Sequence, residues 1–87
     1  MLKSVNKLVA AARNGETNLT LGNHSFSIRN NKWYFTYHGS AVCIVNPIEG
    51  TVLYDNCGYY TSSTTRTINS YAEAFKNLRE VSRDQMF

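Results

Sequence analysis

The sequence changes its period from that of strands to that of a helix within the stretch Asp55-Asn56-Cys57-Gly58-Tyr59-Tyr60-Thr61-Ser62-Ser63-Thr64-Thr65-Arg66-Thr67-Ile68-Asn69. The stretch combines a turn, two adjacent tyrosines and a run of hydroxyl side chains, and it holds few residues of the kind that fill a core. Turn and hydroxyl residues favour loops and helix N-termini. We therefore expect a loop here that leads the chain from a sheet into a helix.

The residues that follow predict this helix. Thr64 or Thr65 is expected to cap its N-terminus, although Ser70 to Glu73 also has the spacing of a capping box. The earlier start is preferred, because Ile68 already belongs to the apolar face. That face comprises Ile68, Tyr71, Ala72, Phe75 and Leu78. Mixed charges at helical spacing would form the solvated face, namely Glu73, Lys76, Glu80, Arg83 and Asp84, and the last residues are expected to fray.

The residues before the stretch, 17–54, alternate apolar and polar side chains with a period of two, which is typical of strands. Turn signals at Gly22-Asn23, Asn30-Asn31, Gly39-Ser40 and 46–50 divide them into a meander of five short antiparallel strands. Lys32 to His38 forms the third strand, with Trp33, Phe35 and Tyr37 on one face as core, opposite Tyr34 and His38. In the last hairpin Val45 is expected to face Thr51, and Cys43 to face Leu53.

The N-terminal residues 2–13 have helical periodicity and end at Asn14-Gly15, where Gly15 suits a left-handed cap. Together these segments predict a single α+β domain over 1–87, in which an N-terminal and a C-terminal helix pack on one face of the sheet. A chain of 87 residues has no room for a second domain.

Composition excludes several classes of function. The formal net charge of +3 permits contact with nucleic acid or an acidic protein but does not require it, and it excludes an acidic imitation of DNA. No apolar run reaches the ~18 residues of a membrane span, and residues 8–12 are too short for a signal peptide. We therefore expect an intracellular protein whose two cysteines stay reduced.

The sequence offers little chemistry for catalysis. His24, His38, Cys43 and Cys57 are dispersed singly, without the paired ligands of a structural zinc site, so neither a metal nor a cofactor is expected. The expected register keeps the two cysteines apart as free thiols, Cys43 in the core, and brings His38 near Cys57. A thiol–imidazole enzyme is therefore a third hypothesis, although nothing in the sequence guarantees an oriented base or a depressed thiol pKa. Phosphate-cradling glycine motifs are absent.

The residues that remain suit binding. Two tyrosines, several hydroxyls and a cation at a helix N-terminus could anchor a protein interface or an anion, and they also suit an ordinary loop. The sequence leaves these two interpretations open. The candidate partner-binding residues are Tyr59, Tyr60, Thr61, Arg66, Asn69, His38 and Lys32. The alternative, direct binding of DNA or RNA, would use Lys3, Lys7, Arg29, Lys32 and Arg66.

One part of the chain resembles a known family. His38-Gly39, a hairpin and then Gly58-Tyr59-x-Thr61-x-Ser63-Thr64-x-x-x-Ile68-Asn69 are similar to an uncharacterised family of small proteins encoded by tailed bacteriophages. Cys57 stands where that family usually has glycine, and Thr67 where it usually has arginine. The resemblance implies a phage accessory protein in the cytoplasm of a bacterial host. Such a protein would bind a host protein or protein–nucleic-acid complex and inhibit it, as anti-CRISPR and anti-restriction proteins do.

Overall fold

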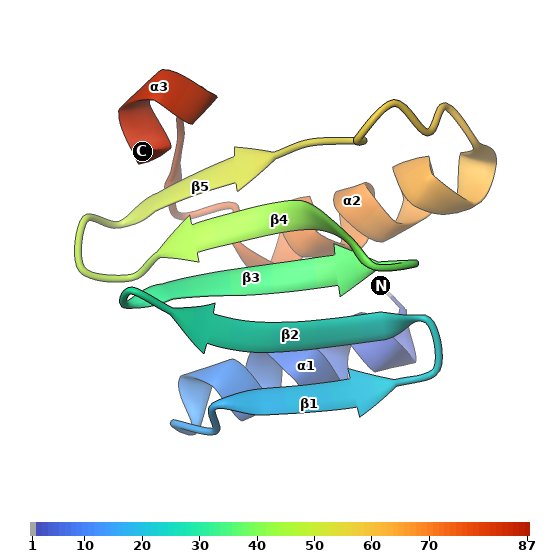
Figure 1. Cartoon of the computed structure of the whole chain (residues 1–87), viewed down its shortest axis with the longest axis horizontal. Coiled ribbons are helices and arrows are strands. Elements are labelled where there is room, and N and C mark those ends of the chain that lie inside the picture. The colour runs from blue at the N-terminus through green and yellow to red at the C-terminus, as the bar shows by residue number, and fades with distance from the viewer. Residues whose placement is uncertain (1) are drawn as a thin grey trace.

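A computed structural model of the chain, which describes residues 2–87, has the expected α+β architecture (Figure 1). The elements follow one another as α1 (Lys3–Arg13), β1 (Asn18–Leu21), β2 (His24–Arg29), β3 (Lys32–Tyr37), β4 (Ser40–Asn46), β5 (Thr51–Tyr54), α2 (Ser62–Ala74), β6 (Arg79–Glu80) and α3 (Arg83–Met86).

The strands form one sheet in the order β1-β2-β3-β4-β5-β6. The first five are the antiparallel meander that the alternating sequence predicts. Two-residue turns join several of them, and Asn30 and Asn31 both have the positive φ, 51° and 64°, that the turn between β2 and β3 requires. The sixth strand was not predicted. It pairs in parallel with β5, through Thr51 opposite Arg79 and Val52 opposite Glu80.

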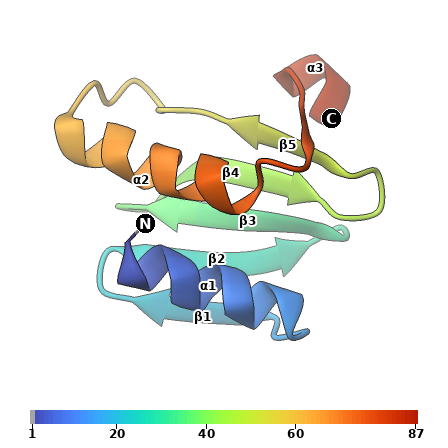
Figure 2. The ribbon, with the colours of Figure 1, turned by 180° about the vertical axis from the view of Figure 1, so that it is seen from behind.

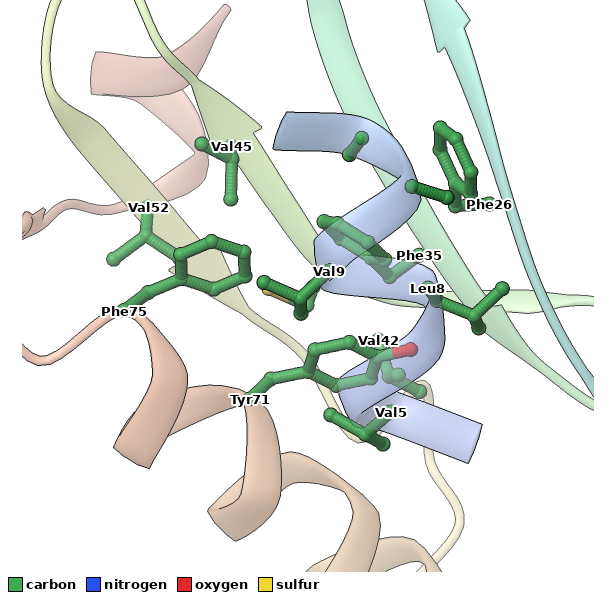
Figure 3. Close-up of a cluster of buried hydrophobic side chains, with 13 residues drawn as sticks. Val5, Leu8, Val9, Phe26, Phe35, Val42, Val45, Val52, Tyr71 and Phe75 are labelled. Carbon is green, nitrogen blue, oxygen red and sulfur yellow. The ribbon is translucent and has the colours of Figure 1, made fainter. Parts of the chain in front are cut away.

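The helices α1 and α2 lie side by side on one face of the sheet (Figure 2). Figure 3 shows their side chains against those of the strands: Val5, Leu8, Val9, Tyr71 and Phe75 from the helices, and Phe26, Phe35, Val42, Val45 and Val52 from the sheet. Each large apolar side chain buried in this way contributes about 1.5–3 kcal/mol relative to exposure. The aromatic alternation on β3 is thus a core feature, as expected, with Phe35 fully buried and Trp33 and Tyr37 half-buried beside it.

Two polar contacts tie the helices together at their ends. The backbone N–H of Leu2 donates to the Ser70 hydroxyl (3.2 Å), and the Arg13 guanidinium donates to the Ala74 carbonyl oxygen (3.0 Å). The end of α1 is the one that the sequence predicts, because Gly15 adopts a left-handed φ of 85° and the chain then turns into β1.

The opposite face of the sheet, here called the open face, carries a smaller apolar cluster and no long helix. Ile44 and Leu53 of the sheet pack there with Val81 and Met86, with Tyr34 half-buried at the edge of the cluster. The short helix α3 brings Met86 to this face and lies beside β5, at that edge of the sheet (Figure 1). The expectation that the last residues fray is therefore wrong, because Met86 is buried and a capping box at Ser82 closes the start of α3.

The predicted bounds of the second long helix are also wrong at both ends. Thr61 caps α2, since its Oγ1 accepts the backbone N–H of Thr64 at 3.2 Å, so neither Thr64 nor Thr65 is the cap. The helix ends at Ala74 with Phe75 as its C-cap, and Leu78 lies beyond it. Glu80 therefore belongs to β6, and Arg83 and Asp84 belong to α3, so these charges do not form one solvated helix face.

The register of the last hairpin differs from the prediction by one residue. Thr51 faces Asn46 and not Val45, and Tyr54 rather than Leu53 faces Cys43. The reason is the Asn46 side chain, whose Oδ1 accepts the N–H groups of Ile48 and Glu49 and so keeps Asn46 in the strand. A shift of one residue changes which side chains of the two strands lie opposite each other on a given face. Leu53 therefore lies opposite Ile44, and the two pack together on the open face.

Candidate partner-binding surface

The loop of residues 55–61, here called the tyrosine loop, is held by its own side chains. The carboxylate of Asp55 accepts the backbone N–H of Cys57 (2.8 Å), and the side-chain oxygen of Asn56 accepts that of Gly58 (3.0 Å). Cys57 and Gly58 both have positive φ, 55° and 82°, and the N–H of Tyr59 donates to the Asn56 carbonyl oxygen. These successive Asx turns give the loop one defined shape.

Two further contacts fix the loop to the rest of the molecule. The Asp55 carboxylate pairs with the guanidinium of Arg83 on α3 at 2.7 Å, and the Cys57 thiol donates to the Ala41 carbonyl oxygen at 3.3 Å. The bond from the Cys57 N–H, and then the bond from Arg83, hold the pKa of Asp55 below its ordinary value. The carboxylate is therefore ionised in its structural role.

Tyr59 and Tyr60 project from this loop. Tyr60 is 86% exposed and Tyr59 52%, among the highest values of any large apolar side chain in residues 2–87. Tyr59 also lines a small pocket of about 160 Å³ between the sheet and the start of α2. The other lining residues are Tyr37, His38, Val42, Thr61, Ser63 and Thr64. The structure thus brings three predicted site residues, His38, Tyr59 and Thr61, to one place.

His38 reaches this pocket from a turn and not from a strand, which corrects the sequence prediction. β3 ends at Tyr37, and His38 and Gly39 form the two-residue turn with φ values of 50° and 80°. The His38 ring lies 4.3 Å from that of Tyr37, which in turn stacks on His24 at 4.8 Å. Burial, and then the nearby His38, lower the pKa of His24, so this aromatic stack favours the neutral imidazole.

The other predicted partner-binding residues lie elsewhere. Arg66 and Asn69 line a separate shallow hollow along α2, with Ser62, Thr65, Ser70 and Glu73. The first turn of α2 separates the two sites, because Ser62 borders the hollow and Ser63 borders the pocket. Lys32 begins β3 at the end of the sheet far from His38, so it does not belong to this surface.

The five basic residues of the nucleic-acid alternative are not brought together either. Lys3 and Lys7 are exposed on α1, and Arg66 is exposed on α2, on the helix-covered side. Arg29 and Lys32 flank the turn between β2 and β3, and Arg29 stacks on Tyr34, whose ring packs against the open-face cluster. The set is therefore divided between the two sides of the sheet.

Neither cysteine has the activated thiol that the thiol–imidazole hypothesis requires. Cys57 lies beside Ala41, two residues along the chain from the expected Gly39, and the register of β4 and β5 differs from the expected one. Partial burial and then the Asp55 carboxylate raise the pKa of the Cys57 thiol. An activated nucleophile needs the opposite change. Cys43 is fully buried, and burial raises the pKa of its thiol as well.

Family models, curated proteins and solved structures give no match to this chain. Within residues 2–87 no three histidine, cysteine or acidic side chains are grouped so that they could hold a metal ion. In the same part of the chain, no helix has the length and apolar character that crossing a membrane requires. The candidate surface therefore has to be interpreted from its own geometry.

Sequence reasoning missed several residues of these surfaces. Phe87 and Arg83 were missed: they form one contact group with the predicted residue Lys32, and both cations lie within 6 Å of the Phe87 ring. Ser63 and Thr64 line the pocket, but nothing in a run of similar hydroxyl residues distinguishes them. The sequence does contain a signal for α3, because Ser82 is followed three residues later by Gln85, the spacing of a capping box.

Proposed function

We propose that this chain is a non-enzymatic binding protein that captures one protein partner through the tyrosine loop and the start of α2. The observation that carries the proposal is the pair Tyr59 and Tyr60, exposed on a loop whose shape is fixed by hydrogen bonds. Exposed apolar side chains next to a pocket are typical of interaction sites.

Tyrosine suits this role for two reasons. It offers a large contact area with few rotatable bonds, and it is enriched among the residues that dominate the energy of protein interfaces. A loop that is already ordered loses little conformational entropy when it binds. Tyr60 would insert into the partner, while the pocket beside Tyr59 and His38 would receive one of the partner's side chains.

Arg66 and Asn69 extend the proposed surface along the exposed flank of α2. Arg66 would contact a carboxylate or phosphate, and Asn69 would supply hydrogen bonds. Since these residues lie across the first turn of α2 from the pocket, the partner would have to reach over this turn.

The resemblance of residues 38–69 to a phage family supports a more specific role. In this proposal the chain acts in the cytoplasm of an infected bacterium, where it inhibits a nucleic-acid-handling or defence complex such as a CRISPR effector or a restriction enzyme. Inhibition would be stoichiometric, since the proposal assigns the chain no catalytic group.

The test combines a double variant with a matched control. Tyr60→Ala with Arg66→Ala removes one exposed ring and one cation from the proposed surface, and Ile48→Ala with Lys76→Ala removes a comparable pair elsewhere. Each protein is expressed in bacteria that carry a CRISPR or restriction system, and the plating efficiency of a targeted phage is measured. The wild type and the control should protect the phage, and the Tyr60/Arg66 variant should not.

The same variants test capture directly. Loss of the two anchor residues should weaken partner binding at least about thirtyfold, because even one hot-spot side chain is worth about 2 kcal/mol or more. Equal protection and equal capture by all three proteins would refute the surface. If the wild type protects phage from no such system but still captures a partner in a way that depends on Tyr60, only the anti-defence role is refuted.

A further inference from the structure

A second group of aromatic and basic residues lies on the open face and contacts the tyrosine loop through the ion pair of Arg83 with Asp55. This basic–aromatic cluster consists of Arg29, Lys32, Tyr34, Arg83 and Phe87. The Arg29 guanidinium carbon lies 4.3 Å from the centre of the Tyr34 ring. Lys32 Nζ lies 5.7 Å, and the Arg83 guanidinium carbon 5.9 Å, from the centre of the Phe87 ring.

Two of the three cations in the cluster make no ion pair within residues 2–87. Arg83 is paired with Asp55, whereas Arg29 and Lys32 make no ion pair within residues 2–87. Asp84 of α3 and Glu80 of β6 are the acidic side chains on the adjoining elements, and both are exposed. Phe87 is 61% exposed although it sits between two cations, so its ring is accessible to a second flat group.

The open face beside the cluster is rich in hydroxyl groups. Across β1, β2 and β3, Ser27 lies opposite Tyr34 and Asn18, and Ser25 lies opposite Thr36 and Thr20. Both long helices lie on the other side of the sheet (Figure 2). Small hydroxyl side chains leave room for a ligand to lie against the strands and can donate or accept hydrogen bonds.

We propose that the basic–aromatic cluster binds single-stranded nucleic acid. One base would stack on the exposed Phe87 ring, and a second on the outer plane of the Arg29 guanidinium, which is itself stacked on Tyr34. Lys32 and Arg29 would neutralise phosphates. Aromatic rings with nearby cations on an open sheet are the features that recognise unpaired bases and the backbone of a single strand.

A single strand fits this site better than a duplex. In a duplex the faces of the bases are already stacked, so the rings would have nothing to contact. Within residues 2–87, the helix on the open face is α3, which has only four residues and so presents no long helix to a groove. The inference goes beyond the proposed function, because the cluster and the tyrosine loop share no binding residue and each can fail without the other.

The experiment measures binding of a fluorescent thymidine or uridine oligonucleotide, about 12 nucleotides long, by anisotropy at low and at physiological salt. The wild type should bind saturably. Arg29→Gln with Lys32→Gln should weaken binding about tenfold and flatten the log–log salt slope by about 1.4, since each lost phosphate contact removes about 0.7. The matched control, Lys3→Gln with Lys7→Gln, removes the same charge from α1 and should change affinity less than about twofold.

A third variant tests stacking separately from charge. Phe87→Ala should weaken binding at least about fivefold without changing the salt slope, since loss of one stacked base costs about 1 kcal/mol or more. Thermal unfolding of each variant checks that the fold is retained.

Four outcomes would overturn the proposal. They are no binding by the wild type at low salt, an equal loss in the Lys3/Lys7 control, equal affinity for a duplex of the same length, and equal affinity for polyglutamate. The last would mean that the cluster is an acidic-protein site.

Discussion

The two faces of the sheet are made from alternate residues of the same strands, yet they have different roles. On β3, Phe35 points under the helices and contacts the rings of Tyr71 and Phe75, 4.8 and 5.6 Å away. Its neighbour Tyr34 points to the open face, where Arg29 covers its ring. Stability is therefore concentrated on one face, which leaves the other free to carry charge and polar groups that a core would not tolerate.

The largest effect should come from breaking the covered face. Phe35→Ala removes a fully buried ring that four other aromatic rings surround, and we expect it to lower the free energy of unfolding by about 3–5 kcal/mol. Urea denaturation followed by circular dichroism measures this. Thr36→Ala, one residue further along the same strand but on the open face, is the control and should cost far less. Similar losses for the two variants would contradict the division between the faces.

A smaller effect is expected from the apolar cluster of the open face. Met86 is buried there on the short helix α3, and Met86→Ala should cost about 2 kcal/mol, near the lower limit for buried methionine, because the cluster is small. Hydrogen exchange should show lost protection in residues 79–87 and little change in α1. Loss of protection throughout the chain would instead mean that the two faces unfold as one unit.

The covered face also offers a change of the opposite sign. The Tyr71 side chain is fully buried, and its hydroxyl finds no hydrogen-bond partner within residues 2–87. Tyr71→Phe keeps the packed ring and removes the unsatisfied group, so it should raise the free energy of unfolding by about 1 kcal/mol. Thermal and urea unfolding both report this change. A loss of stability would show that the hydroxyl has a partner.

The smallest effect concerns the ion pair that joins the tyrosine loop to α3. Because the pKa of Asp55 is lowered in the folded state, its contribution is complete above its ordinary pKa of 3.8 and disappears as the pH falls through the folded value. Asp55→Asn should therefore cost less than about 1 kcal/mol at neutral pH, as expected for a partly exposed pair. The difference in the free energy of unfolding between the variant and the wild type should disappear in acid. A difference that persists at the lowest pH would assign the effect to the turn.

Most of the fold follows from the sequence, because its signals are local. The alternation in residues 17–54 predicts the strands, and asparagine and glycine at positions such as Asn30 and Asn31 predict the tight turns. The errors arise where contacts between distant parts of the chain determine the structure. β6 is held by backbone bonds, from Arg79 N–H to the Gly50 carbonyl oxygen and from Val81 N–H to that of Val52, which no side-chain pattern reveals.

The candidate site was predictable in part for the same reason. The tyrosine loop and its hydroxyl run stand out in the sequence, and their contact with His38 follows from pairing of neighbouring strands. The position of Arg66 depends on the rotation of α2, which is set by the cap at Thr61, one among several equivalent hydroxyl residues. The basic–aromatic cluster depends on the return of α3 to the open face.

The meander has a consequence for the order in which the chain folds. Each of the first five strands pairs with its neighbour in sequence across a short turn, and hairpins of this kind form within roughly 1–10 μs. The covered face, by contrast, closes only when α1 meets α2, as in the bond from Leu2 to Ser70. We expect the hairpins of the sheet to form early and the docking of the two chain ends to limit the folding rate.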